Sequence, residues 1–354
     1  MRSAWWYGLA FSVPASMVPA LWLGGAWVWL TPAFVFVVVP LLDVPFGLET
    51  KDPDPAVVGS GRTGLHQAWL VSWVLVQLGL MAWTFARVAD PGASGLERLG
   101  WVVSLGVVNG ACGITIAHEL MHRRSRWEFR LSELLMALVA YPHFCVEHVF
   151  GHHKHVATPH DPATARWGQS VFSFLPQTLI GSFQSFWSIE RDRRRGWRDA
   201  RFWYPAYVAG IAAVVGVAFG PWGLGAFFGQ ATVAVFLLEV INYVEHYGLE
   251  RSKRSDGRYE RVQPEHSWNS AHRLTSALLF ELPRHSDHHH VASRPYPLLR
   301  HHEGSPQLPA GYATMVLAAL VPPLWRRVMD PRVAAARRAA AVKADSSGGL
   351  RSGA

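Results

Sequence analysis

Long runs of apolar residues alternate with short polar segments along most of the chain. Six of these runs approach the length of roughly 20 residues that an α-helix needs to cross the hydrocarbon core of a bilayer. They cover residues 4–24, 26–42, 65–86, 99–117, 203–220 and 222–243. The pattern predicts an all-α, polytopic membrane protein with about six transmembrane helices. The last two runs are joined by GPWGLG, which is typical of a tight turn between antiparallel helices.

Two further apolar segments lie between the fourth and fifth runs, at 131–146 and 172–189. Proline and polar residues interrupt both segments, so we expect interfacial or cytoplasmic helices rather than further crossings. Residues 1–330 are predicted to form a single membrane-embedded domain. Residues 331–354 are rich in Ala, Arg, Ser and Gly, and we expect a basic tail that is flexible or partly helical.

The amino-acid composition and the placement of charge agree with a membrane protein. Hydrophobic residues make up 50% of the 354 positions and charged residues 16%, below the roughly 25% charged residues of soluble domains. The net charge of +8 does not indicate nucleic acid, because the basic residues lie in loops, where the positive-inside rule accounts for them. Twelve Lys or Arg lie at 121–202. This bias places that segment and both termini on the cytoplasmic side of a bacterial-type inner membrane.

Cysteine usage limits the redox chemistry that the chain can carry by itself. The two cysteines, Cys112 and Cys145, form no CxxC pair. The sequence therefore encodes neither a structural zinc site nor an iron–sulfur or rubredoxin module. Any electrons that a redox reaction needs must come from another protein.

The histidines gather in four groups, and seventeen of the eighteen lie at or beyond His118. HELMH places two imidazoles four residues apart, on one face of a helix, and EHVFGHH repeats this spacing with a third histidine beside it. NYVEHYG and RHSDHH add one and three more. The nine candidate metal ligands are His118, His122, His148, His152, His153, His246, His285, His288 and His289. Because nine nitrogen ligands exceed what one ion takes, we expect a cytoplasmic-side site for two metal ions, each with four or five histidines.

Other interpretations of this site have to be weighed. HELMH matches the H-E-x-x-H motif of zinc metalloproteases, with Glu119 as the base, but such a site needs only about three protein ligands. Imidazole ligands alone leave zinc, copper, iron and nickel open. Four carboxylates beside the ligands could accept ring N–H bonds, or could form ordinary salt bridges with Arg123, Arg284 or another neighbour. They are Glu119, Glu147, Glu245 and Asp287.

Five motifs closely resemble those of the integral-membrane alkane 1-monooxygenases, in the fatty-acid desaturase and hydroxylase superfamily. They read HELMHR, EHVFGHHKHVATPHDPATAR, NYVEHYGL, HSWNS and RHSDHH, and the resemblance extends from about residue 40 to 300. It implies a non-haem di-iron centre, held by the same nine histidines, that uses O2 to hydroxylate the terminal methyl group of medium- or long-chain alkanes. It also implies electrons from rubredoxin, reduced by its reductase. The basic residues 191–201 are a candidate docking surface for that acidic protein, or alternatively they only set the topology and contact lipid headgroups.

The segments around the last motif depart from the family pattern, at 281–285 and 290–297. No candidate ligand is lost, but the substrate is left open. Hydroxylation of alkyl side chains of aromatics, as in the xylene monooxygenase hydroxylase, is one alternative, and lipid desaturation with the same metals is another. A metal transporter is a remote alternative, because the apolar runs carry few acidic groups, with Glu239 the main one.

Overall fold

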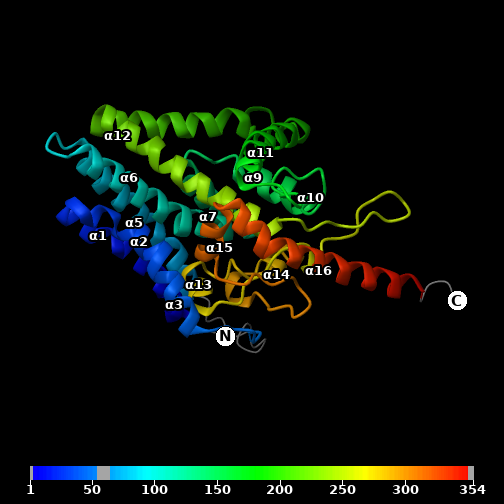
Figure 1. Cartoon of the computed structure of the whole chain (residues 1–354). Helices are drawn as coiled ribbons and strands as arrows, with labels where there is room; N and C mark the ends of the chain where they lie inside the picture. Colours follow the sequence, from blue (N-terminus) through cyan, green and yellow to red (C-terminus); the bar gives the residue numbers. More distant parts are fainter. Residues whose placement is uncertain (1–2, 54–63, 350–354) are drawn as a thin grey trace.

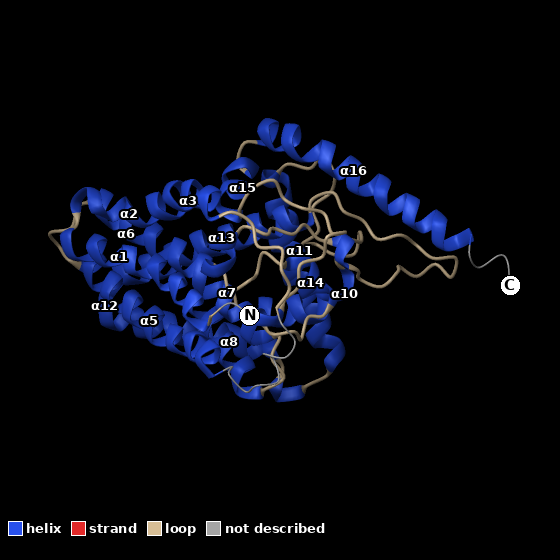
Figure 2. Ribbon diagram, turned by 90° about the horizontal axis from the view of Figure 1, so that it is seen from below, coloured by secondary structure: helices blue, strands red, loops and turns tan. Residues whose placement is uncertain are grey.

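The computed structural model describes residues 3–53 and 64–349, and this part of the chain is helical, with three isolated β-bridges and no strand (Figure 2). Within it, five helical segments are long and apolar enough to cross a membrane. They are Ala4–Leu23, Gly25–Phe46, Gly64–Ala89, Gly95–Met121 and Ala200–His246. The prediction of an all-α, polytopic membrane protein is confirmed. The count of six crossings stays a prediction.

The fifth segment, α12 (Ala200–His246), contains both of the last two predicted crossings. Its helical geometry breaks at Gly220, which has a φ of 66° and is followed by Pro221. This backbone conformation is open to glycine because glycine has no Cβ. In Figure 1 the two arms of α12 meet beside the α12 label at the left, and both extend from there toward the right. The turn expected at GPWGLG is therefore a sharp kink.

Three of the first four segments combine α-helix with 3-10 or π turns. The first consists of the 3-10 helix η1 (Ala4–Phe11) and α1 (Ser12–Leu23). The second consists of η2 (Gly25–Trp29), α2 (Leu30–Ala33), the π turn η3 (Phe34–Val38) and α3 (Val39–Phe46). The third is α5 (Gly64–Ala89), and the fourth consists of α6 (Gly95–Val108), the π turn η4 (Asn109–Gly113) and α7 (Ile114–Met121). Such π turns are often found at functional sites.

Small residues let α6 approach the second arm of α12 closely. A Cβ added at Gly106 would lie 2.5 Å from the Cβ of Val233 and 2.8 Å from the carbonyl oxygen of Gln230. One turn further along, the Nδ2 of Asn109 donates to the Oε1 of Gln230 at 2.8 Å. Close backbone approach with an interhelical polar bond is a usual way for helices to associate in a bilayer.

The remaining helices lie at one end of this bundle. They are α8 (Arg126–Leu138), α9 (Phe144–Glu147), the π turn η5 (His148–His152), α10 (His153–His155), α11 (Val171–Arg193), α13 (Arg273–Leu278), α14 (His285–His290), α15 (Tyr312–Ala319) and α16 (Pro322–Gly349). Short 3-10 turns are found at Gly196–Arg198, Pro264–His266 and Tyr296–Leu298. The two apolar segments expected outside the bilayer fall mainly on α8, α9 and α11, which are not among the five candidate spans.

The C-terminal helix α16 packs on the body through its first half. Trp325, Met329 and Val333 are completely buried. Beyond them, Arg337 donates to the carbonyl oxygen of Gly248 at 2.8 Å and pairs with Glu250 at 2.6 Å. The predicted tail from residue 331 is thus helical as far as Gly349, and its first turns are anchored to the body.

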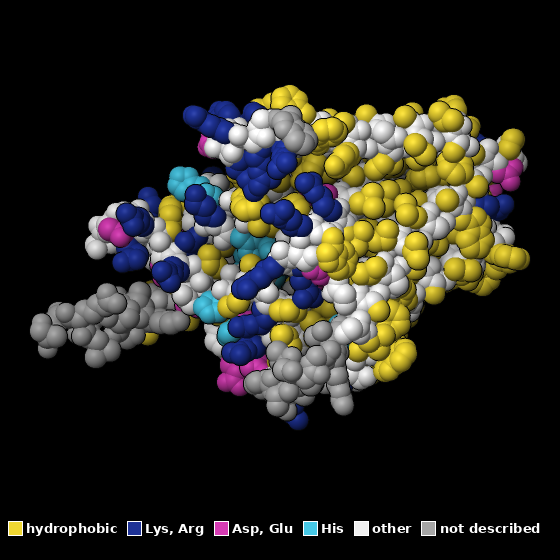
Figure 3. Space-filling view, turned by 180° about the vertical axis from the view of Figure 1, so that it is seen from behind, with side chains coloured by type: hydrophobic (Ala, Val, Ile, Leu, Met, Phe, Trp, Pro, Cys, Tyr) yellow, Lys and Arg dark blue, Asp and Glu magenta, His cyan; other side chains and the backbone are white. Residues whose placement is uncertain are grey.

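The surface of the molecule divides into an apolar half and a charged half. In Figure 3, hydrophobic side chains cover one half, while Lys, Arg and His side chains gather on the other. Large apolar side chains are exposed on the spans. They include Val217, Leu75 and Trp22, with 91%, 76% and 75% of their surface exposed. Such a large apolar surface is unfavourable in water for a single soluble molecule, whereas it is favourable in contact with lipid.

Candidate metal centre

The nine candidate ligands come from four segments of the chain that meet near one end of the bundle. His118 lies in α7 and His122 directly follows it, while the three EHVFGHH histidines lie on η5 and at the start of α10. His246 ends α12, and α14 carries the last three. All nine side chains are buried or partly buried. Every predicted ligand is therefore present where the four segments meet, although these segments are distant from one another in the sequence.

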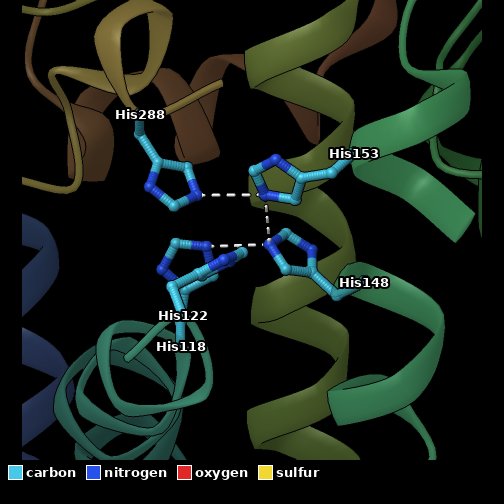
Figure 4. A group of neighbouring side chains, drawn as sticks. All are labelled: His118, His122, His148, His153 and His288. Atoms are coloured by element: carbon cyan, nitrogen blue, oxygen red, sulfur yellow. Dashed lines mark hydrogen bonds between the residues drawn. The ribbon is translucent and has the colours of Figure 1, made fainter. Parts of the chain in front are cut away.

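Five of the nine imidazoles form a first group, drawn in Figure 4. One ring nitrogen from each lies within 4.8 Å of those of the others. The Nε2 atom of His148 lies 2.9 Å from the Nε2 of His118 and 3.0 Å from the Nε2 of His153. The Nε2 of His288 lies 3.1 Å from that of His153. The fifth member is His122.

The other four imidazoles form a second group beside the first. His152, His246, His285 and His289 also place one ring nitrogen each within 4.8 Å of one another. The Nε2 atoms of His246 and His285 are 3.2 Å apart. The rings of His153 and His289 stack at a centroid distance of 4.2 Å, so the two groups touch.

The donor set fits metal ions better than it fits a hydrogen-bonded histidine cluster. A neutral imidazole has one N–H donor and one acceptor nitrogen. Where several rings direct their acceptor nitrogens toward one point, no N–H group is left there to donate to them. The buried Nε2 of His122, the Nε2 of His152 and both nitrogens of His289 have no hydrogen-bond partner. Such unpaired buried atoms are costly, and metal ions would satisfy them. The two groups therefore fit a site for metal ions.

The protonation state of the rings also suits metal binding. Burial, reinforced by neighbouring imidazoles, lowers the pKa of His148, His153 and His288 well below the usual 6.5. The same causes lower the pKa of His285 and His289. These rings are therefore neutral near pH 7, which is the form that binds a metal.

His152 differs from the other eight, because a carboxylate holds its second nitrogen. Its Nδ1 lies 2.9 Å from the Oδ2 of Asp161, which also accepts from the hydroxyl of Thr164 at 2.6 Å. Burial alone would lower the pKa of His152, but the charge and hydrogen bond of Asp161 raise it overall. A carboxylate in this position orients a ligating ring and strengthens its basicity. The sequence analysis missed Asp161, although it lies in the same polar stretch as three of the histidines.

Two of the four carboxylates singled out from sequence have cationic partners. Glu119 pairs with Arg123 at 2.6 Å and accepts from the backbone N–H of Tyr296 at 3.1 Å. Asp287 contacts Arg294 and lies 2.7 Å from the Nε2 of His302. Both side chains therefore form ion pairs with neighbouring arginines.

The other two carboxylates, Glu245 and Glu147, are buried close to the candidate ligands. The Oε2 of Glu245 lies 3.2 Å from the Nε2 of His285, and its Oε1 accepts from the hydroxyl of Tyr312 at 2.7 Å. Glu147 precedes His148 and is 1% exposed, and burial raises its pKa to about 8. Of the four, Glu245 comes nearest to a candidate ligand nitrogen.

An apolar cavity lies between the spans, beside the histidines. His118, His148 and His285 form part of its wall. Its apolar lining comes from several spans and includes Val35, Phe36, Ala111, Ile114, Leu238 and Ile241. Two of the π turns, η3 and η4, contribute to this lining. Polar side chains of Asn242 and Glu245 also face the cavity. The arrangement can therefore bring an apolar group close to the metal site.

The chain resembles proteins of known families over nearly its whole length. Residues 96–318 match the fatty acid desaturase family. The chain is 45% identical to alkane 1-monooxygenase 1 of Pseudomonas aeruginosa, in an alignment that covers 93% of this chain and 90% of that protein. It is 42% identical to alkane 1-monooxygenase 2 of Alcanivorax borkumensis, over 87% and 83% of the two chains. The xylene/toluene monooxygenase hydroxylase component of Pseudomonas putida is 28% identical, over 90% and 86%. The matched residues include all four histidine-bearing elements.

Proposed function

Because this chain belongs to the fatty acid desaturase family and, within it, to the alkane 1-monooxygenases, we propose that it hydroxylates the terminal methyl group of medium- or long-chain alkanes to 1-alkanols. The observation that carries this proposal is the apolar cavity whose lining includes three candidate metal ligands. A substrate without polar groups can be recognised only by the shape and apolar surface of such a cavity.

The two histidine groups would hold a pair of non-haem iron ions. His118, His122, His148, His153 and His288 would bind one, and His152, His246, His285 and His289 the other. When bound, the iron pair supplies the activation of O2 and the oxidation of the C–H bond. The bond between Asp161 and His152 would orient one ligand of the second group.

The side chains that line the cavity would bind the alkane and orient it relative to the histidines. Burial from water contributes about 0.8 kcal/mol per CH2, and less when the alkane arrives from the bilayer, which is already apolar. The lining of Val, Ile, Leu and Phe side chains would admit an extended alkane end first, so that its terminal methyl group reaches the histidines. Asn242 and Glu245 offer polar atoms at the wall, where the new hydroxyl group would be hydrogen-bonded.

Rubredoxin, reduced by its reductase, is the proposed electron donor. In the described residues both cysteines are free and buried, which agrees with electrons that come from a separate protein. The candidate docking surface at 191–201 is basic, with Arg191 64% exposed. Arg191, Arg193 and Arg201 in the same stretch pair with Asp192, Glu190 and Asp199. The exposed Arg194 and Arg195 are therefore the better candidates for contacting an acidic partner. We further propose that this face is cytoplasmic.

The second candidate function is hydroxylation of the alkyl side chains of aromatics. The xylene/toluene monooxygenase component is less similar to this chain, at 28% identity, than the alkane 1-monooxygenases at 42% to 45%. This difference favours alkanes over alkylbenzenes. A desaturase would use the same metals without transferring oxygen to the product.

A turnover assay with labelled oxygen tests the proposal. The chain would be purified in lipid nanodiscs, its metal content measured, and turnover followed with reduced rubredoxin, 18O2 and separate n-alkanes, alkylbenzenes and fatty acyl esters. We expect a pair of iron ions per chain and 1-alkanol that carries the label. Unlabelled alkenes would indicate desaturation instead. Metal uptake into sealed vesicles with no alkane-dependent O2 consumption would indicate a transporter.

A further inference from the structure

A second cavity lies on the outer side of the bundle, away from the histidines. It is an open groove of about 710 Å³ between α5, α8 and the first arm of α12. None of the nine candidate ligands and none of the residues of the central cavity contributes to its wall. The groove therefore serves another purpose than holding the substrate at the metal site.

Most of the groove has an apolar wall that follows the spans. On α12 its lining extends from Ala206 to Phe219, which is about 20 Å of helix at 1.5 Å per residue. On α5 the wall includes Met81 and Phe85. The groove is thus longer than one leaflet of a hydrocarbon core that is about 30 Å thick, and its shape suits an extended acyl chain.

One end of the groove carries an arginine. Arg130 of α8 belongs to the lining, and 70% of its side chain is exposed. Its Nη1 donates to the Oε2 of Glu133 at 2.7 Å, which uses one of the five N–H donors of the guanidinium. The Oε1 of Glu133 accepts from the hydroxyl of Tyr204 at 2.7 Å. The carboxylate is therefore held from the protein side, and the guanidinium faces outward.

The surroundings of Arg130 are those of a membrane interface. Arg126 precedes it by four residues, so both exposed arginines lie on the same face of α8. The exposed aromatic side chains of Trp127 and Tyr207 lie on α8 and in the groove wall. Tryptophan and tyrosine gather where the hydrocarbon core meets the headgroups, and cations at that level attract anionic lipids.

We propose that this groove is a binding site for one anionic phospholipid. The phosphate group binds the outward face of Arg130, and one acyl chain lies along Met81, Phe85 and the first arm of α12. The occupant is a lipid and not a second copy of this chain, because a site with a cationic mouth above an apolar trough complements an anionic headgroup above a hydrocarbon tail. This inference does not depend on the proposed reaction.

Two variants remove the two halves of the site separately. Arg130→Gln removes the cation. Gly210→Phe fills the trough, since a Cβ at Gly210 meets no atom within 4 Å and Gly210 is part of the lining. Gly216→Phe is the matched control, because Gly216 lies on the same arm of α12, has the same open space and is not part of the lining.

Native mass spectrometry of the full chain would be carried out after reconstitution in nanodiscs of phosphatidylglycerol or phosphatidylcholine. We expect one retained phosphatidylglycerol per chain in the parent and in Gly216→Phe. Retention should fall at least about fivefold in Arg130→Gln, since a charge-assisted bond to phosphate is the stronger kind of hydrogen bond, and fall likewise in Gly210→Phe.

Four results would overturn the assignment. The first is equal retention in all four proteins. The second is equal retention of phosphatidylglycerol and phosphatidylcholine by the parent. The third is a dimer that Gly210→Phe dissociates and Gly216→Phe does not. A loss confined to Arg130→Gln would also contradict it, because it would indicate surface attraction without occupation of the groove.

Discussion

The Nδ1 atom of His152 lies 2.9 Å from the Oδ2 atom of Asp161, and both side chains are buried. The other nitrogen of this ring, Nε2, has no hydrogen-bond partner and faces the second histidine group. The carboxylate thereby selects which ring nitrogen is offered to a metal ion.

Asp161→Asn should weaken metal binding at the second group. An amide keeps the size of the carboxylate but loses its charge, and loss of such a partner typically costs 10- to 100-fold in metal affinity. Iron retained per chain would be measured during dialysis against a graded series of chelator concentrations. Asp192→Asn, at a side chain that is 74% exposed, is the control. Equal retention in the two variants would show that Asp161 has no part in metal binding.

His285→Ala should remove iron and activity, whereas His290→Ala should remove neither. Both residues lie on α14, but His285 belongs to the second group and His290 is exposed. Loss of a ligand leaves an incomplete coordination sphere, so we expect alkane turnover to fall at least about 100-fold, as for other groups that act as a unit. Iron analysis and product formation would be measured on the same preparations. A His290→Ala protein as inactive as His285→Ala would contradict this division of α14.

Glu239→Leu should destabilise the bundle more than Thr178→Val. The buried carboxylate of Glu239 accepts from Tyr141 at 2.9 Å, from Thr178 at 2.7 Å and from Asn242 at 3.0 Å. Leucine leaves three buried donors unpaired, at about 1–3 kcal/mol each, while Thr178→Val removes a single donor. Thermal unfolding in detergent would report the order of the two midpoints. Equal midpoints would mean that water or other groups replace the carboxylate.

Ala111→Phe should shift turnover toward shorter alkanes. Ala111 lines the central cavity, and a phenyl ring there takes up space that the alkane needs. Each CH2 excluded from the cavity forgoes up to about 0.8 kcal/mol, which is about a fourfold change in relative kcat/KM per carbon. Competition between pairs of n-alkanes measures this ratio directly. Ala213→Phe, at an exposed position on α12, should leave the profile of the parent, and a shift in that control would point to a general loss of packing.

Gly106→Val should separate α6 from α12. The added side chain meets Val233 and the backbone of Gln230, and backbone cannot move aside cheaply. We expect a loss of about 1–3 kcal/mol, typical of overpacking, seen as a lower midpoint of thermal unfolding. Gly216→Val, with open space around its Cβ, should cost less than this. If the two variants unfold alike, the close approach at Gly106 is not needed for stability.

The sequence by itself determined the class of the protein and the set of candidate ligands. Runs of about 20 apolar residues have few stable forms other than a membrane-spanning helix, because every backbone polar group must be satisfied within the run. Histidines at i and i+4 share a helix face wherever that helix is placed. The five apolar segments and the histidine pairs that share a helix face follow from these local rules.

Only the tertiary structure decided how the ligands are divided and what surrounds them. His152 and His153 are neighbours in sequence, yet their rings belong to different groups, because consecutive side chains on a helix point about 100° apart and each meets a different partner element. Asp161 reaches His152 through a loop whose path no periodicity encodes, and Glu239 finds Tyr141 and Thr178 on other segments. The outer groove exists because three helices are placed side by side. These relationships depend on packing between residues far apart in the chain, which local spacing does not specify.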